Sequence, residues 1–314
     1  MHYNWAIVGL GTVADEFASA LQQAQLPVAA VQSRSAEKAK HFCQKFNIQK
    51  YYTSYTDLLA DDTIDIIYIA TPHSMHYEMV KQALLNKKHV LCEKAITVNA
   101  DELEDLMTLS EEKQCLLAEG TTLFYMPLYH ELKKQMPQFG QLKMIQANFG
   151  SFKDDKHDNR FFDTKSAGGA LLDIGPYAFG ICQWFMPSYP QLIDSTVVFH
   201  PSGVDESSVT ILKSENSLAS VNLTFRAKMP KQAILAFDKG YLTIDDYPRA
   251  TTATFTTPDQ KKYVIDAHDN IHAFVHEYLT VEEWLNNENY QSPYLKDVHH
   301  ILTLFDECRR KWEK

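Results

Sequence analysis

Trp5-Ala6-Ile7-Val8-Gly9-Leu10-Gly11-Thr12-Val13-Ala14 is an apolar run that ends in two closely spaced glycines, and a helix-like segment continues to Gln23. A dinucleotide-binding fingerprint requires this succession of strand, turn and helix. Gly9 would permit the tight turn. Gly11 would permit the close approach of a pyrophosphate, whose charge the amide groups at the helix N-terminus favour. Ala14 replaces the third glycine, where a small residue suffices for packing. The stretch predicts a nucleotide site, with an ordinary glycine turn as the alternative.

Short apolar runs alternate with amphipathic segments through the first third of the chain. The expected strands are Ala6–Val8, Val28–Gln32, Ile66–Ile69, His89–Leu91 and Leu116–Glu119, and the expected helices are Val13–Gln23, Ala36–Phe46, Met75–Leu85 and Ala100–Glu112. Strands that alternate with helices predict right-handed βαβ units and a parallel sheet. Because ligands of such sheets collect at the carboxyl ends of the strands, the residues that follow each strand are the candidates for chemistry.

The composition narrows the class of protein. A chain of 314 residues is long enough for more than one domain. The formal net charge of −10 and the lack of a basic tract argue against nucleic acid or an anionic membrane as a partner. No apolar run approaches the ~20 residues of a membrane span, and the first strand begins too near Met1 for a signal peptide. The five cysteines are scattered, without a C-x-x-C pair, which predicts reduced thiols in a cytoplasmic protein and no zinc site.

The residues after the second expected strand bear on the choice of cofactor. An NAD site usually carries Asp or Glu there to bind the ribose 2′-hydroxyl, and this chain has none. Instead, Arg34 lies between Ser33 and Ser35, a combination that suits a 2′-phosphate. This pattern indicates NADP(H) in preference to NAD(H). A solvated arginine in a turn is the alternative.

The next two strand ends carry further candidates. Ala70-Thr71-Pro72-His73-Ser74-Met75-His76 follows the strand at Ile66–Ile69, and Pro72 fixes the backbone where a ring could lie against it. His76 could face the cofactor, but either histidine could equally be satisfied by backbone groups at a helix start. Glu93 and Lys94 follow the strand at His89–Leu91, which would put Lys94 at the mouth of the sheet. A surface Glu–Lys pair is the alternative there.

The pattern changes from about Thr122. A helix is expected at Pro127–Gln135, a strand at Leu142–Gly150, a charged loop at Ser151–Ala167 and an apolar segment at Ala170–Phe185. Further strands at hairpin spacing are Thr196–His200, Ser207–Leu212, Leu218–Arg226, Gln232–Phe237, Tyr241–Ile244 and Ala250–Thr256, and two helices, Ile271–Asn286 and Leu295–Trp312, follow. The spacing predicts an open, mainly antiparallel sheet. We therefore expect an α/β protein with an N-terminal Rossmann domain, 1–121, and a C-terminal α+β domain, 122–314.

Two sets of residues in the second part have helical spacing. Asp173 and Tyr177 lie at i and i+4 and would share a helix face, unless Pro176 starts a fresh helix. A helix cap and a core ring are the structural alternatives for this pair. His272 and His276 share the same spacing, with His268 one turn earlier, but no H-E-x-x-H pattern and no nearby cysteine completes a metal site. We expect a solvated or interface histidine face and no metal.

These segments resemble the Gfo/Idh/MocA oxidoreductases over nearly the whole chain, most of all the branch of dimeric dihydrodiol dehydrogenases and NADP-dependent D-xylose dehydrogenases. The matching motifs are Gly9-Leu10-Gly11-Thr12-Val13-Ala14, Ser33-Arg34-Ser35, Ala70-Thr71-Pro72-His73, Leu91-Cys92-Glu93-Lys94, Gly168-Gly169-Ala170-Leu171-Leu172-Asp173-Ile174-Gly175-Pro176-Tyr177 and Gly203-Val204-Asp205-Glu206. Two positions differ from the common pattern. Ala95 replaces the proline of the family's Glu-Lys-Pro motif, and Tyr177 stands where many members have histidine and the dihydrodiol branch has tyrosine.

The resemblance implies roles for particular residues. Lys94 and Tyr177 would be the catalytic pair, Asp173 would support them, and Arg160 and Phe161 would border the substrate together with Asp173 and Tyr177. The cofactor would contact Gly9, Gly11, Thr12, Val13, Ser33, Arg34, Thr71, Pro72, His73, His76, Glu93 and Lys94. The resemblance also implies a homodimer formed through the open sheet.

The expected activity is hydride transfer between NADP(H) and a sugar, a polyol or a vicinal (dihydro)diol, or the matching carbonyl compound. Two alternatives use the same scaffold: a non-catalytic NADP-binding regulator, and cofactor-assisted glycoside cleavage. The presence of both Lys94 and Tyr177 favours an enzyme, because a regulator needs neither.

Overall fold

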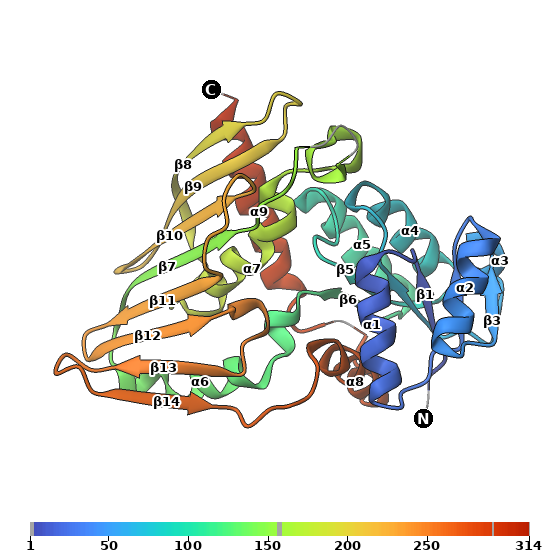
Figure 1. The fold of residues 1–314 in the computed structure, drawn as a ribbon, viewed down its shortest axis with the longest axis horizontal. Coiled ribbons are helices and arrows are strands. Elements are labelled where there is room, and N and C mark those ends of the chain that lie inside the picture. The colour runs from blue at the N-terminus through green and yellow to red at the C-terminus, as the bar shows by residue number, and fades with distance from the viewer. Residues whose placement is uncertain (1–2, 156–158, 291, 314) are drawn as a thin grey trace. The chain divides into compact units, whose positions relative to one another are not determined.

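A computed structural model describes residues 3–155, 159–290 and 292–313, and its described residues form two compact units. One unit consists of Met1–Gly120 and Ile271–Leu295, and the other of Thr121–Asn270 and Lys296–Lys314. The chain thus leaves the first unit near residue 121 and returns to it for one late segment. Figure 1 follows the chain through both units by colour.

The first unit is built on a parallel six-stranded sheet in the order β3-β2-β1-β4-β5-β6. The strands are β1 (Trp5–Val8), β2 (Ala30–Gln32), β3 (Lys50–Tyr52), β4 (Ile66–Ile69), β5 (His89–Glu93) and β6 (Leu117–Gly120). The order reverses between β1 and β4, so the ends of these two strands form the switch point at which such sheets bind ligands. This arrangement confirms the predicted parallel sheet, to which β3 is an addition.

The helices of the first unit pack apolar faces onto this sheet. They are α1 (Thr12–Gln23), α2 (Ala36–Phe46), α3 (Tyr55–Leu59), α4 (His73–Leu85), α5 (Ala100–Lys113) and, from much later in the chain, α8 (Ala273–Asn286). The core stacks Phe17 of α1 on Tyr68 at 3.8 Å between ring centroids, and Tyr278 of α8 on Trp5 at 4.5 Å. Because α8 buries its apolar side in this core, it belongs to the first unit although it follows residue 122.

The second unit contains a mixed eight-stranded sheet, whose order β14-β13-β12-β11-β7-β10-β9-β8 can be followed in Figure 1. Its strands are β7 (Leu142–Gly150), β8 (Gln191–Phe199), β9 (Asp205–Ser214), β10 (Ser217–Thr224), β11 (Gln232–Phe237), β12 (Gly240–Asp245), β13 (Thr252–Thr256) and β14 (Lys262–Asp266). Every neighbouring pair is antiparallel except β7 with β10. The prediction of an open, mainly antiparallel sheet is confirmed.

One face of this sheet is covered by helices and the other keeps exposed apolar side chains. The helices of the unit are α6 (Pro127–Phe139), α7 (Ala170–Phe185) and α9 (Leu295–Trp312), and α7 packs against β7, β9 and β10. On β10 every second residue is buried, whereas Leu218 remains 44% exposed beside its register partner Met144, which is 45% exposed. Ile193, Val198 and Val209 of β8 and β9 are similarly exposed.

Helix α7 is continuous through Pro176. Proline removes one backbone N–H from a helix interior, and nearly all of α7 is buried, so the surrounding packing holds it in place. Asp173 and Tyr177 therefore do share one helix. In the described part of the chain, no helix is both long enough and apolar enough to cross a membrane.

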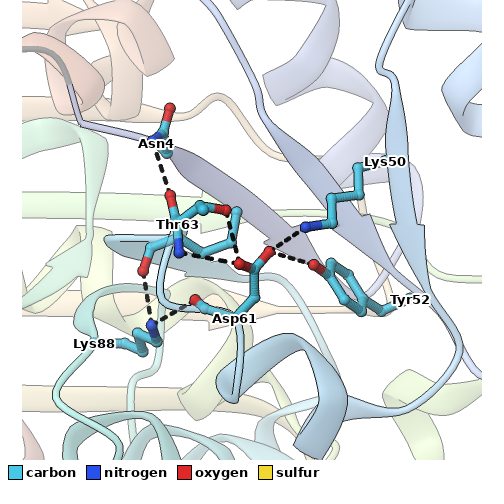
Figure 2. A network of polar contacts seen from close by, with 7 residues as sticks. Asn4, Lys50, Tyr52, Asp61, Thr63 and Lys88 are labelled. Atoms are coloured by element: carbon cyan, nitrogen blue, oxygen red, sulfur yellow. Dashed lines mark hydrogen bonds and ion pairs between the residues drawn. The ribbon is translucent and has the colours of Figure 1, made fainter.

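A polar network lies at the amino ends of the parallel strands, away from the switch point (Figure 2). Asp61 is its centre: its Oδ2 accepts hydrogen bonds from Lys50 Nζ, at 2.5 Å, and from the Tyr52 hydroxyl, and its Oδ1 accepts from Thr63. Lys88 Nζ donates to the Asp61 carbonyl at 2.8 Å. The hydrogen bonds from Lys50 and Tyr52 hold the pKa of Asp61 well below its usual range.

We expect Asp61→Asn to lower the free energy of unfolding by about 1–2 kcal/mol at pH 7, because the carboxylate holds Lys50 and Tyr52 and Lys50 is half exposed. A carboxyl group with a depressed native pKa stabilises the fold above its unfolded pKa of about 4, and that stabilisation is lost as the pH falls through the native value. The difference between wild type and variant should therefore shrink below about pH 4. Urea unfolding at a series of pH values measures it. The neighbouring exposed Asp62, changed to Asn, is the control, and an equal loss in both variants would contradict the assignment.

Candidate active site

The turn between β1 and α1 has the form that a dinucleotide pyrophosphate requires. Gly9 has a φ of +84°, and a Cβ there would lie 2.7 Å from the Ala70 carbonyl oxygen at the end of β4. Only glycine fits this position without strain. In the part of the chain that the structure describes, a Cβ at Gly11 would meet nothing within 4 Å, and no side chain caps the N-terminus of α1. The amide groups of Thr12 and Val13 thus begin a helix beside open space, which suits a bound anion.

The turn after β2 presents an exposed arginine on an ordered backbone. The Ser35 side chain caps α2 by accepting from the Lys38 amide at 3.2 Å, and the Ser33 hydroxyl oxygen accepts from the Ser35 amide at 3.3 Å. Arg34 is exposed between them. Because both serines fix the backbone of the turn, the Cα of Arg34 has a defined position and the side chain extends from there.

The segment after β4 is tied to the segment after β5 by two histidines. The ring nitrogens of buried His76 lie 2.8 Å from the carbonyl oxygens of Thr71 and Ala95. His73 Nε2 lies 3.2 Å from the Lys94 carbonyl oxygen, and Pro72 precedes the first turn of α4. Both rings therefore bond to the backbone at Lys94 and Ala95. Their contact with a cofactor stays a prediction.

Glu93 ends β5 and Lys94 follows it, and the two residues have different surroundings. Glu93 is buried, and its Oε1 accepts a hydrogen bond of 2.5 Å from the hydroxyl of fully buried Tyr68. Burial raises the pKa of the neighbouring Cys92 thiol, and Glu93 and Glu119 raise it further, so this thiol stays protonated. Lys94 is half-buried at the carboxyl end of the strand, and the peptide bond that joins it to Ala95 is cis. A surface Glu–Lys pair does not describe these positions, because Glu93 lies in the core.

Asp173 and Tyr177 lie one turn apart on α7 and are 8% and 9% exposed. The ring of Tyr177 lies 6.1 Å from that of Phe149 on β7. The short 3-10 turn Arg160–Phe162 reaches the start of the same helix, since the Phe161 carbonyl oxygen accepts from the Gly169 amide at 3.0 Å. Phe162 is buried while Arg160 is exposed. The second unit therefore places four of the predicted substrate and catalytic residues on or beside the first turns of α7: Arg160, Phe161, Asp173 and Tyr177.

The histidines with helical spacing have structural partners. His272 is the N-cap residue of α8 and its side chain accepts from the Phe274 amide. His268 lies outside the helix, 3.7 Å from Asp266. Within residues 3–155, 159–290 and 292–313, no three His, Cys, Asp or Glu side chains lie close enough together to hold a metal ion.

Tyr68 and Asp205 make contacts at these sites that were not predicted. Tyr68 is the one polar side chain in Ile66-Ile67-Tyr68-Ile69, and a buried tyrosine hydroxyl usually has a partner, so the sequence held a signal for its bond to Glu93. Asp205 lies in a motif that the resemblance used, yet nothing in the sequence gave it a partner 34 residues away in α7.

Two family models match the chain. A model described as the oxidoreductase family with an NAD-binding Rossmann fold matches residues 3–121. A model of the GFO/IDH/MocA C-terminal domain matches residues 135–243. The matched ranges fall on the parallel sheet and on the first part of the mixed sheet, and they confirm the predicted α/β class.

Curated relatives and solved structures agree with these matches. The trans-1,2-dihydrobenzene-1,2-diol dehydrogenase of Xenopus tropicalis is 32% identical over 274 residues, which cover 84% of this chain and 82% of that protein. The human enzyme of the same name is 34% identical over 218 residues, 68% of this chain and 64% of that protein.

Among solved structures, a 3-ketoreductase from Actinomadura kijaniata in complex with NADP and TDP-benzene has a TM-score of 0.91, 21% identity, and coverage of 99% of this chain and 98% of its own. The aldose-aldose oxidoreductase from Caulobacter crescentus complexed with glycerol has a TM-score of 0.89 at 18% identity, with coverage of 100% and 98%. At these identities the likeness establishes the fold.

Proposed function

The chain belongs to the Gfo/Idh/MocA family of oxidoreductases, and from this premise we propose that it transfers a hydride between NADP(H) and a CH–OH group. The substrate is a sugar, a polyol or a vicinal (dihydro)diol, or the matching carbonyl compound. The observation that carries the proposal is the turn between β1 and α1, where an uncapped helix N-terminus begins beside open space at Gly11. The substrate class is supported by relatives named as dihydrodiol dehydrogenases and by a solved aldose-aldose oxidoreductase of the same fold.

The cofactor preference rests on Arg34. The turn after β2 carries no carboxylate that would bind a ribose 2′-hydroxyl and repel a 2′-phosphate, and the exposed Arg34 guanidinium supplies charge and several N–H donors. The complex of the Actinomadura kijaniata ketoreductase with NADP supports the same choice. We therefore assign NADP(H), with NAD(H) as the weaker cofactor.

Arg34→Ala should weaken NADP+ binding by about 1.5–3 kcal/mol, because it removes hydrogen bonds to a charged phosphate. NAD+ binding should barely change. Titration calorimetry with each cofactor measures both. Lys38→Ala, which removes another exposed cation from the same helix start, is the control. Equal losses for NADP+ and NAD+ would contradict the 2′-phosphate assignment.

We propose that Tyr177, assisted by Lys94 and Asp173, moves the hydroxyl proton while the hydride is transferred. The bound nicotinamide accepts or supplies the hydride. Tyr177 takes the hydroxyl proton during oxidation and returns it during reduction. A phenol has a pKa of ~10, too high for an efficient base at neutral pH, and a lysine ammonium beside it would favour the phenolate. Lys94 has this role in the proposal, and Asp173, one turn before Tyr177, supports the pair.

A single assay separates this proposal from its alternatives. The protein is mixed with NADP+ and a panel of sugars and cyclic or open-chain diols, and the absorbance of reduced nicotinamide is followed. Turnover of any member supports the dehydrogenase. Binding of NADP+ without turnover would favour a regulator, and cleavage of a glycoside with no net reduction of NADP+ would favour the third activity.

We also propose two properties of the protein as a whole. The exposed apolar face of the mixed sheet, which includes Met144 and Leu218, supports a homodimer formed through that sheet. Equilibrium sedimentation tests this, and a monomeric mass would contradict it.

All five cysteines are free and buried, which supports a cytoplasmic location, and a secreted native protein would contradict that assignment.

A further inference from the structure

Helix α7 begins without a cap of its own. Its N-cap residue is Gly169, which has no side chain to accept from the first amides of the helix. Asp205, the first residue of β9, supplies this acceptor from 34 residues away, since its Oδ2 lies 2.6 Å from the Leu171 amide nitrogen. Open amides at a buried helix start are costly, so this carboxylate fixes where the helix begins.

Gly169 leaves the space that the Asp205 carboxylate occupies. A Cβ on Gly169 would lie 2.2 Å from Asp205 Oδ1, and the φ of +120° at Gly169 is one that other residues rarely adopt. The two residues are thus complementary. Glycine is required at position 169 for two reasons: its positive φ, and the space that the Asp205 carboxylate of β9 occupies.

The same point holds the predicted substrate loop. The Gly169 amide donates to the Phe161 carbonyl oxygen at 3.0 Å, and the Gly168 amide donates to the Asp163 carbonyl oxygen at 2.9 Å. A Cβ on Gly168 would lie 2.6 Å from the Phe161 carbonyl oxygen. The Arg160–Phe162 turn and the first turn of α7 therefore depend on one junction.

Asp205 is itself held by a tight turn and by charge. Gly203, with a φ of +95°, donates its amide to the His200 carbonyl oxygen at 2.8 Å, and Asp205 pairs with Phe199 across β8 and β9. The residue is partly exposed, but its carboxyl group is enclosed, and this burial raises its pKa to about 6. The Leu171 amide and the Arg309 guanidinium oppose the rise.

We propose that Asp205 is a positioning residue: by capping α7 in the space left by Gly169, it sets the placement of Asp173 and Tyr177 and of the Arg160–Phe161 turn. This inference rests on the proposed function, since it concerns the placement of the proposed catalytic residues. Asp173 lies in the helix turn that the cap closes, and its amide donates to the Gly169 carbonyl oxygen at 3.2 Å. Tyr177 lies one further turn along α7. A shift of the helix start would move both side chains.

Asp205→Ala should lower kcat by about 10- to 100-fold, the scale expected when reacting groups are misplaced by about 1 Å, while NADP+ affinity stays unchanged. Asp205→Asn keeps an oxygen acceptor of the same size and should restore most of kcat. Amide hydrogen exchange over residues 170–177 should rise at least tenfold in Asp205→Ala and stay near the wild-type rate in Asp205→Asn. Asp194→Ala removes an exposed carboxylate from β8 of the same sheet and should change neither measurement.

Wild-type exchange and wild-type kcat in Asp205→Ala would overturn the inference. Faster exchange with an unchanged kcat would also overturn it, because Asp205 would then serve stability alone. If Asp205→Ala fails to fold, Asp205→Asn decides the case. A kcat lowered 10- to 100-fold together with at least tenfold faster exchange in Asp205→Asn would contradict the role of Asp205 as an acceptor. If the wild type turns over no substrate, the proposed function fails, and exchange alone then decides whether Asp205 fixes α7.

Discussion

Tyr177→Phe is expected to lower kcat by about 10²- to 10⁴-fold, the usual contribution of a general acid–base group, and to leave NADP(H) affinity nearly intact. The change deletes one hydroxyl group and keeps the ring. Because Tyr177 is 9% exposed and its ring lies 6.1 Å from that of Phe149, phenylalanine retains this packing. The expected loss therefore belongs to proton transfer and not to the fold. Steady-state kinetics on a substrate that the wild type turns over measures it.

Tyr247→Phe is a matched control for this experiment. Its ring lies at the same distance of 6.1 Å from Phe149, and its buried hydroxyl has no hydrogen-bond partner among the described residues. The same chemical change at this second ring beside Phe149 should leave kcat close to that of the wild type. Full activity in Tyr177→Phe would remove this tyrosine from the mechanism, and His76 would be the next candidate.

The sequence predicted best those helices and strands whose apolar residues form a regular pattern. Helix α2 and strands β7 and β11 lie where the apolar periodicity placed them, because burial on one side leaves a repeating pattern in the residue order. Strand β4 is buried along its whole length and was predicted from a short, unbroken apolar run. Strands β3 and β14 were not predicted. Both are edge strands whose residues are mostly exposed, so neither shows a buried alternation.

Membership of a core could not be predicted from local pattern. The apolar side of α8 has helical spacing, which predicts a helix but not the surface against which it packs. Its partners, Trp5 and Phe17, lie more than 250 residues earlier in the chain. A boundary at residue 121 follows the order of the sequence, whereas the unit follows this long-range contact.

In the candidate site, too, residues with a local sequence pattern could be predicted, whereas contacts between distant segments could not. Gly9 and Gly11 could be assigned because a glycine turn between strand and helix is a local feature. The bond of His76 to the Ala95 carbonyl oxygen, and that of Asp205 to Leu171, join separate segments and leave no local pattern. Residues that orient a site are therefore harder to predict than those that line it, since their partners are set by packing.

Lys94→Met should lower kcat by about 10²-fold, because it removes the ammonium that favours the phenolate of Tyr177 in our proposal. Methionine keeps an unbranched apolar stem at this half-buried position. The Lys94 carbonyl oxygen would still meet His73 and the Ala95 carbonyl oxygen would still meet His76, so the backbone should keep its place. NADP+ titration and thermal unfolding of the variant would verify that binding and fold are retained.

The pH dependence of the Lys94→Met variant identifies how this lysine acts. In carbonyl reduction Tyr177 must be protonated, so the rate falls as the pH rises through the pKa of its phenol. Loss of a neighbouring cation raises that pKa and should shift the alkaline limb of the pH–rate profile to higher pH. The double variant with Tyr177→Phe should be little worse than the worse single variant, because residues that act as one unit are not additive. An unshifted alkaline limb, with losses that multiply in the double variant, would mean that Lys94 acts independently of Tyr177.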